Sequence, residues 1–344
     1  MTSPVLRIGA ASVVVRRRAL LATAGIVAAA VLLAALSLGS GSFPLSPRDV
    51  VDALLGTADA RTTLVVMEWR LPRLVAAVVF GAALGASGAA FQSLTRNPLG
   101  SPDVLGFDSG AVTGALAAMF LVGFAQPTVT AGALVGGLVT AAFVAAVGLG
   151  THSGRGAGFR LIVVGVGVST VLVAVNQIVI MRATLEEATR ASSWSLGSVA
   201  EVGWSQLRLA APCIAVLLVA LWLVARPARM IEIHHDAAAA FGVNPRAVRV
   251  GLIVVGVGLV AVATSVAGPI TFVALVAPHL ARRLTGLPTL AVGSSAAMGA
   301  TLLLAADVAV QNVPTTSTLP VGVGTLVLGG GYFAWLLWRG RREL

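Results

Sequence analysis

Long apolar runs alternate with short polar segments along almost the whole chain. Uncharged or nearly uncharged runs lie at about 19–39, 74–94, 104–124, 128–149, 161–181, 209–225, 250–280, 290–311 and 319–338. Most are close to the length of about 20 residues that an α-helix needs to cross a bilayer. The run at 74–94 also lacks the polar stripe at the helical period that a core helix of a soluble protein shows. The pattern therefore predicts an all-α polytopic membrane protein.

The run from Val250 to Leu280 decides the number of spans. Its 31 residues would form a single helix of about 46 Å, which is too long for a hydrocarbon core of about 30 Å. Gly268-Pro269 interrupts the run near its middle, and arginines stand at both of its ends. A hairpin that returns both ends to the cytoplasm satisfies the excess of positive charge expected on that side. We therefore expect about ten transmembrane helices, of which the eighth is short.

The placement of arginine predicts the orientation in the cytoplasmic membrane. All 23 basic residues are Arg, and a topology with both termini inside leaves sixteen of them in the cytoplasm and seven outside. The expected organisation is a cytoplasmic segment at 1–18, one transmembrane permease domain at 19–338 and a cytoplasmic tail at 339–344. A cytoplasmic connector is expected at about 226–248. The first span is expected to be retained, because its length and the many spans after it do not suit a signal peptide.

Composition excludes several classes of function. The chain of 344 residues is 57% hydrophobic and 10% charged, whereas soluble domains carry about 25% charged residues. It contains no Lys, which excludes a P-loop, and neither HExxH nor CxxC occurs. The net charge of +10 is dispersed between apolar runs, so it indicates membrane sidedness and not nucleic-acid binding. We expect no catalytic site, no metal site and no cofactor bound by this chain.

Few ionisable residues fall within the predicted spans. Asp307 is the only acidic residue deep in the later ones, and either a structural role or a role in gating fits it. Asp108 lies at the start of the third span, where a carboxylate suits the positive end of a helix. Ser101-Pro102-Asp103 before it has the pattern of an N-cap followed by proline at the first helical position. His279 is expected to form a structural hydrogen bond.

Five separated segments carry a family resemblance. They are RLPR at 70–73, GAALGASGAAFQSLTRNPL at 81–99, WSLGS at 194–198, GPITFVALVAPHLARRLTG at 268–286 and LPVGVGTLVLGG at 319–330. In this order they resemble the FecCD-type permeases, the membrane subunits of ABC importers for iron-siderophores and vitamin B12. RNPLGSPDVLGF at 96–107, together with the last segment, is most similar to the branch of ferric-enterobactin permease subunits. The resemblance implies the type II ABC importer permease architecture, with ten spans in each subunit.

The resemblance also implies partners and a cargo. A second permease subunit, expected to be a homologous heterodimer partner, would complete a central pathway. Two separate ATPase subunits would bind ATP and Mg in the cytoplasm, and a substrate-binding lipoprotein or periplasmic protein would dock outside. The cargo implied is a ferric siderophore of catecholate type.

The resemblance also implies which residues dock the binding protein and which form the cytoplasmic gate. Arg70 and Arg73 match outward arginines that pair with carboxylates of the binding protein, although both also suit an interfacial anchor. A third arginine position of this kind is Gln311 here. Asn97, Pro98 and Leu99 match the cytoplasmic gate, although Asn97-Pro98 is also a simple turn signal.

Further residues are implied in the coupling segment and in the last span. The segment from Glu232 to Gly242 is Ala-rich, with Gly242 placed to end a helix. It matches the region that contacts the ATPase, through Glu232, His234, His235, Asp236, Ala238, Phe241 and Gly242. The family usually has Gly followed by an acidic residue where this chain has His234-His235-Asp236. Gly322, Gly324, Gly329 and Gly330 lower side-chain bulk in the last span and are candidates for the pathway or the subunit interface.

Other functions remain as alternatives. A cobalamin or haem permease of the same family would have the same motifs, because the pathway is largely apolar and the binding protein selects the cargo. A secondary transporter driven by ions would require carboxylates at the bilayer midplane, and only Asp307 lies near one. A membrane enzyme would require a polar catalytic cluster, which the sequence lacks.

Overall fold

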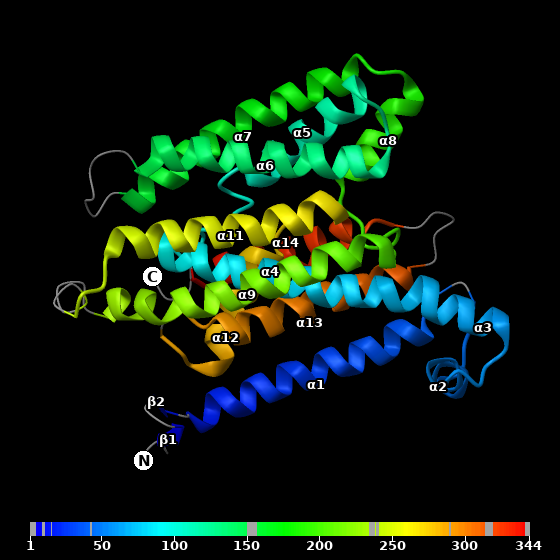
Figure 1. Cartoon of the computed structure of the whole chain (residues 1–344), viewed down its shortest axis with the longest axis horizontal. Helices are drawn as coiled ribbons and strands as arrows, with labels where there is room; N and C mark the ends of the chain where they lie inside the picture. Colours follow the sequence, from blue (N-terminus) through cyan, green and yellow to red (C-terminus); the bar gives the residue numbers. More distant parts are fainter. Residues whose placement is uncertain are drawn as a thin grey trace.

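The computed structural model describes residues 5–8, 11–14, 16–41, 43–149, 157–233, 238, 241–288, 290–313 and 319–340. Helices make up nearly all of this part of the chain (Figure 1). The helices are α1 (Arg17–Gly39), α2 (Pro47–Leu55), α3 (Ala60–Leu64), the π-helical turn η1 (Val65–Arg70), α4 (Leu71–Thr95), α5 (Phe107–Leu121), α6 (Gln126–Leu149), α7 (Ala157–Met181), α8 (Leu185–Ser195), α9 (Trp204–Ile233), α11 (Pro245–Ala267), α12 (Val273–Thr285), α13 (Val292–Gln311) and α14 (Val321–Gly340).

The predicted membrane helices are present. Among the described residues, seven helices are long and apolar enough to span a bilayer, and α5 and α14 contain shorter apolar helices. The break at Gly268-Pro269 is also confirmed, because α11 ends at Ala267 and α12 begins at Val273 after a turn. Together with α5, α14 and the short α12, the seven long helices agree with the prediction of about ten spans. The prediction missed a small antiparallel hairpin near the N-terminus, β1 (Val5–Ile8) with β2 (Ala11–Val14).

Helix α4 is the central helix of the bundle. The apolar window of its span is 72% buried, against 6% for α1. In Figure 1, α1 and α13 lie on one side of α4 and α9, whereas α5, α6 and α7 form a group on the other side of α11. The burial of α4 explains why its sequence is so rich in Gly and Ala: every face of the helix meets another helix.

Glycines set the closest helix contacts. A Cβ atom at Gly85 of α4 would collide with the carbonyl oxygen of Ser295 on α13, and one at Gly88 would collide with the carbonyl of Ala274 on α12. In the same way, Gly114 of α5 faces the carbonyl of Gly132 on α6. Such close approach compensates for the lack of a hydrophobic driving force between helices in lipid.

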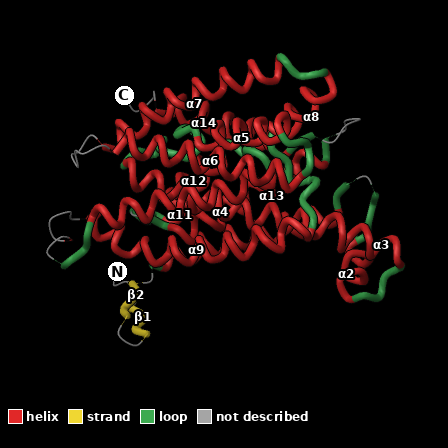
Figure 2. Tube along the Cα trace, turned by 45° about the horizontal axis from the view of Figure 1, so that its top comes forward, coloured by secondary structure: helices red, strands yellow, loops and turns green. Residues whose placement is uncertain are grey.

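Both ends of the described chain lie at one end of the bundle. Arg18, at the start of α1, donates to the carbonyls of Arg283 and Leu284 at the end of α12, at 3.0 and 3.1 Å. The Arg283 and Arg339 guanidinium groups lie over the Trp335 ring of α14. The short helices α2, α3 and α8 lie at the opposite end (Figure 2). After the orientation predicted from the sequence, we call the end with α2, α3 and α8 the outer end and the end with the last turn of α12 the inner end.

Candidate functional site

Three of the five motif segments meet at the outer end. Gly197, in WSLGS, has φ +71°, and a Cβ there would collide with the Pro269 carbonyl at the break between α11 and α12. Gly268, at φ +72°, faces the Trp194 carbonyl in the same way. The Gly322 N–H at the start of α14 donates to the Gly197 carbonyl at 3.0 Å. Only glycine fits such left-handed, closely opposed backbones, so the motif glycines fix how α8, α12 and α14 join.

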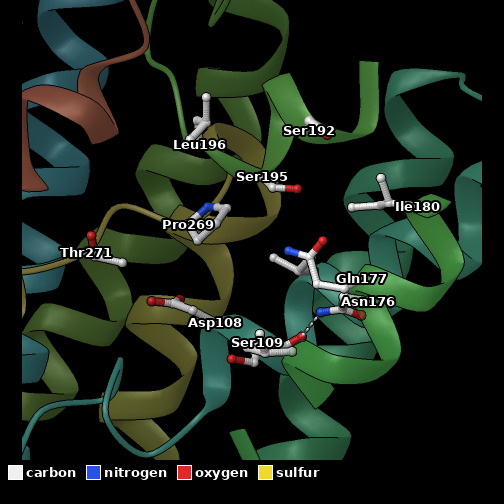
Figure 3. Close-up of a pocket in the computed structure, with 12 residues that line it drawn as sticks. Asp108, Ser109, Asn176, Gln177, Ile180, Ser192, Ser195, Leu196, Pro269 and Thr271 are labelled. Carbon is white, nitrogen blue, oxygen red and sulfur yellow. Dashed lines mark hydrogen bonds between the residues drawn. The ribbon is translucent and has the colours of Figure 1, made fainter. Parts of the chain in front are cut away.

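A pocket of about 370 Å³ opens beside this junction (Figure 3). Pro269 and Thr271 of the α11–α12 break form one wall, and the other residues come from α5, α7 and α8. The pocket is lined by Asp108, Ser109, Val112, Val173, Asn176, Gln177, Ile180, Ser192, Ser195, Leu196, Pro269 and Thr271. The Asn176 amide is oriented by its Nδ2–H bond to the Ser109 carbonyl at 3.3 Å and by the Thr113 hydroxyl at 2.8 Å. Most polar groups lining the pocket are uncharged.

The start of α5 differs from the prediction. Residues 102–106 form turns, and α5 begins at Phe107 after Gly106, whose φ is +82°. Ser101-Pro102-Asp103 is therefore not an N-cap. Asp103 instead accepts a hydrogen bond from the Phe272 backbone N–H at 2.9 Å, across to the start of α12. This tertiary bond replaces the local capping bond, because Phe272 also has a left-handed backbone (φ +68°) and its N–H needs an acceptor.

Asp108 lies where the sequence places it, in the first turn of α5, and it is 7% exposed. One of its carboxylate oxygens accepts from the Thr264 hydroxyl of α11 at 3.0 Å. The contact joins α5 to α11 beside the pocket, which Asp108 also lines.

A buried ion pair joins the outer end of α4 to α13. Two nitrogens of the Arg73 guanidinium group donate to the Asp307 carboxylate, with Nη2–Oδ1 at 2.7 Å and Nε–Oδ1 at 3.0 Å. Asp307 is fully buried, whereas 19% of the Arg73 side chain is exposed. The Gln311 amide donates to the second carboxylate oxygen at 2.6 Å. Asp307 therefore has a structural partner, as the first of its two predicted roles requires.

Arg70 is also engaged within the chain. Its guanidinium group donates to the Leu38 carbonyl at 2.6 Å and to the Phe43 carbonyl, so it holds the segment after α1 against the start of α4. Arg70 and Arg73 are both half-buried at the outer end, on the side where a docking partner was predicted. Docking through these two arginines stays a prediction, and any partner would have to compete with these internal acceptors.

The predicted gate residues lie at the inner end of α4. The helix ends at Arg96, which adopts a left-handed backbone with φ +51°. The Asn97 side-chain oxygen accepts from the Leu99 N–H at 2.9 Å, which fixes a turn around Pro98. Leu99 is 44% exposed. An exposed leucine held by one local turn suits a gate, but the gating role itself stays a prediction.

The coupling segment is described in part. Gly242 has the left-handed backbone expected of a residue that ends a helix, at φ +78°, and the Val243 N–H bonds to the Ala238 carbonyl at 3.0 Å. Ala238 is buried and Phe241 is 77% exposed. Glu232 points into the subunit, where it contacts Ser93 and Leu290. His234, His235 and Asp236 lie outside the described residues.

The glycines of the last span pack inside the subunit. Gly322 faces the Leu196 carbonyl, Gly324 faces Val310 of α13, and Gly329 faces Phe272. Gly330 has open space where a Cβ would point. Three of the four candidates thus have internal contacts, and a role in the pathway or at the subunit interface stays a prediction for all four. His279 contacts the Tyr332 ring, with the ring centroids 5.9 Å apart.

Sequence reasoning missed the pairing of Arg73 with Asp307. The two residues are separated by 234 positions. The signal was present, because the only deep carboxylate of the later spans requires a positive partner and both residues lie at outer ends of predicted spans. No comparable signal marks the bond between Asp103 and the Phe272 backbone, which depends on a turn that brings two connectors together.

Comparison with known proteins agrees with this arrangement. The family model described as the FecCD transport family matches residues 28–339. The chain belongs to the FecCD transport family. It is 45% identical to the ferric enterobactin transport system permease protein FepG of Escherichia coli (strain K12), over 94% of this chain and 97% of the relative. It is 32% identical to the hemin transport system permease protein HmuU of Yersinia pestis, over 91% of this chain and 95% of that protein.

A solved structure shows the same fold. It is described as a metal-chelate type ABC transporter in an inward-facing conformation, and it is 26% identical to this chain with a TM-score of 0.80. The match covers 92% of this chain and 98% of that one. The architecture of this FecCD-family chain is therefore that of an ABC importer permease, a transport subunit of the membrane.

Proposed function

We propose that this chain is the permease subunit of an ABC importer that moves a ferric siderophore of catecholate type across the cytoplasmic membrane. The observation that supports this most is the 45% identity to a ferric enterobactin permease along nearly the full length of both chains. Relatives named for hemin or for ferric dicitrate are 32% identical.

The energy for transport would come from a separate ATPase. The chain has no Lys and therefore no P-loop, so ATP and Mg would be bound by two ATPase subunits at the inner end. The exposed Phe241 and the turn at Gly242 support a contact there. In this orientation both termini would lie in the cytoplasm, because the start of α1 and the end of α14 both contact the last turn of α12.

A second permease subunit would cover the exposed apolar sides of the bundle. Helix α7 carries exposed Val163, Val171 and Ile178, and only 11% of its apolar window is buried. The pocket lies between α5, α7, α8 and the α11–α12 break. Its amide and hydroxyl groups could donate hydrogen bonds to a bound cargo, and the one carboxylate in its lining, Asp108, already accepts a hydrogen bond from Thr264.

The binding protein would dock at the outer end, above α2, α3 and α8. Arg70 and Arg73 would offer guanidinium groups to its carboxylates. Both arginines already bond to acceptors within this chain. Contacts to the binding protein would therefore form in addition to these internal bonds.

Uptake by the reconstituted importer tests the function. The chain would be placed in liposomes with its second permease, its ATPase and its binding protein, and supplied with iron-labelled ferric enterobactin, cobalamin or haemin. We expect ATP-dependent uptake of the iron complex alone. Uptake of cobalamin or haemin in its place would assign the chain to another cargo within the family, and uptake without ATP would exclude an ABC importer.

A further inference from the structure

Glu232 lies at the inner end of α9 and is the first residue of the segment, 232–242, that was predicted to contact the ATPase. Both oxygens of its carboxylate are used inside the chain. One accepts a hydrogen bond from the Ser93 hydroxyl of α4, and the other accepts from the Leu290 backbone N–H at 3.0 Å. Hydrogen bonds to a charged acceptor are stronger than those between neutral groups, so Glu232 is firmly attached to two other parts of the bundle.

The two partners of Glu232 lie at positions that matter for gating. Ser93 is in the last turn of α4, shortly before the left-handed Arg96 and the predicted gate at Asn97 to Leu99. Leu290 immediately precedes Ala291, the N-cap of α13. Because its carboxylate bonds both to the last turn of α4 and to the residue before the N-cap of α13, a displacement of Glu232 would act on both helices.

A second polar contact ties the same turn of α4 to α12. The Gln92 side chain is 2% exposed and donates to the Leu275 carbonyl at 2.9 Å. Its amide oxygen accepts from Arg282, which is also attracted by the Glu232 carboxylate. The last turn of α4 is thus joined through side chains to α9, α12 and the start of α13.

We propose that Glu232 is a positioning residue that transmits displacement of the coupling segment to the last turn of α4 and hence to the gate. It acts inside the permease and not as a contact to the ATPase. The inference rests on the proposed function, because it requires an ATPase that pushes or pulls on residues 232–242. Coupling between the two sites runs through the Glu232–Ser93 bond.

The test compares Glu232→Ala, Ser93→Ala and the double variant in the complete importer, with Glu201→Ala as control because Glu201 is an exposed carboxylate at the outer end. We expect each single variant to assemble with the ATPase and to hydrolyse ATP, while cargo moved per ATP falls about tenfold for Glu232→Ala. Ser93→Ala should fall in the same direction. The double variant should be no worse than Glu232→Ala, because both changes remove one bond.

A readout without cargo separates this inference from the function itself. Leu99→Cys would be introduced in a Cys213→Ala background, and its labelling by a water-soluble maleimide measured with and without a non-hydrolysable ATP analogue. We expect a nucleotide-dependent change in labelling that Glu232→Ala abolishes and Glu201→Ala keeps. Loss of ATPase binding in Glu232→Ala, unchanged transport per ATP, or a labelling change that persists in Glu232→Ala would each overturn the proposal. Failure of the parent importer to move a siderophore, with the labelling response intact, would overturn only the proposed cargo.

Discussion

The two ends of α4 are held in different ways. At the outer end, Arg73 forms a forked ion pair with the fully buried Asp307, and Gln311 satisfies the same carboxylate. At the inner end, Glu232 and Gln92 bind the last turn, but the chain then leaves through the left-handed Arg96 to the exposed Leu99. Segments with few buried contacts open most easily. We therefore expect the outer end to anchor the helix and the inner end to be the part that moves.

The glycine contacts between the two ends should show the largest effect when they are broken. Gly85→Val places side-chain atoms against the Ser295 carbonyl of α13. Backbone opposes the new atoms, so we expect a loss of more than about 3 kcal/mol, the upper range of ordinary overpacking. Gly25→Val on α1 is the control, because nothing lies within 4 Å of its Cβ position. Unfolding in mixed SDS and detergent micelles would measure both variants, and equal stability would contradict the close contact.

The ion pair at the outer end should come next. Asp307→Ala leaves the Arg73 guanidinium half-buried without its carboxylate, which we expect to cost about 3–5 kcal/mol of stability. Replacing both residues by Ala should recover part of this loss. The Arg190–Glu186 pair, whose side chains are 61% and 78% exposed, offers a control, because Glu186→Ala should cost about 0–1 kcal/mol. Unfolding in mixed micelles would rank the variants, and a small loss for Asp307→Ala would show that the outer end is not anchored by this pair.

The gate turn should respond in function more than in stability. Asn97→Ala removes the acceptor of the Leu99 N–H, and a net loss of about 1 kcal/mol is expected for one hydrogen bond. We expect near-normal unfolding together with an increased ATP-independent leak of cargo from loaded liposomes. Pro98→Ala, which keeps the side-chain acceptor, should leak less. An Asn97→Ala variant whose liposomes leak no more cargo than the parent protein's would argue against a gate at this turn.

The smallest effect should come from the cap of α8 at the outer end. The Thr184 backbone N–H and hydroxyl bond to the Glu187 carboxylate and lower its pKa. A carboxyl group whose pKa is lowered by folding stabilises the folded state above its ordinary pKa of about 4.3 and loses this contribution as pH falls through the lowered value. We expect residues 185–195 to lose protection from hydrogen exchange in acid, measured against the intrinsic exchange rate at each pH, and Glu187→Gln to show a weaker pH dependence. The same pH dependence in both proteins would contradict this.

The sequence predicted the spans better than it predicted the contacts between them. Hydrophobic runs and the Gly268-Pro269 break depend on local composition, and the structure confirms both. The order of motifs was also sufficient for the family. Ser101-Pro102-Asp103 was misjudged because its capping pattern competes with a tertiary bond to Phe272 that no local signal reveals.

For the candidate site residues too, the sequence did not reveal which residues contact one another. Arg73 and Asp307 were singled out separately, and only the fold brings them together. All four candidate glycines of the last span were predicted for the pathway or the subunit interface, and three of them also make internal contacts with Leu196, Val310 and Phe272. Close packing and interface packing require the same small residues, so sequence cannot separate them.

Spin-label distances at both ends of α4 test the comparison most directly. One pair, Trp69→Cys with Val313→Cys, reports the outer end, and a second, Leu99→Cys with Leu284→Cys, reports the inner end; all four positions are exposed, and Cys213→Ala removes the native thiol. The complete importer would be measured with and without a non-hydrolysable ATP analogue. We predict that nucleotide shifts the inner distance and leaves the outer one unchanged. A shift confined to the outer pair would contradict an anchored outer end and a movable gate.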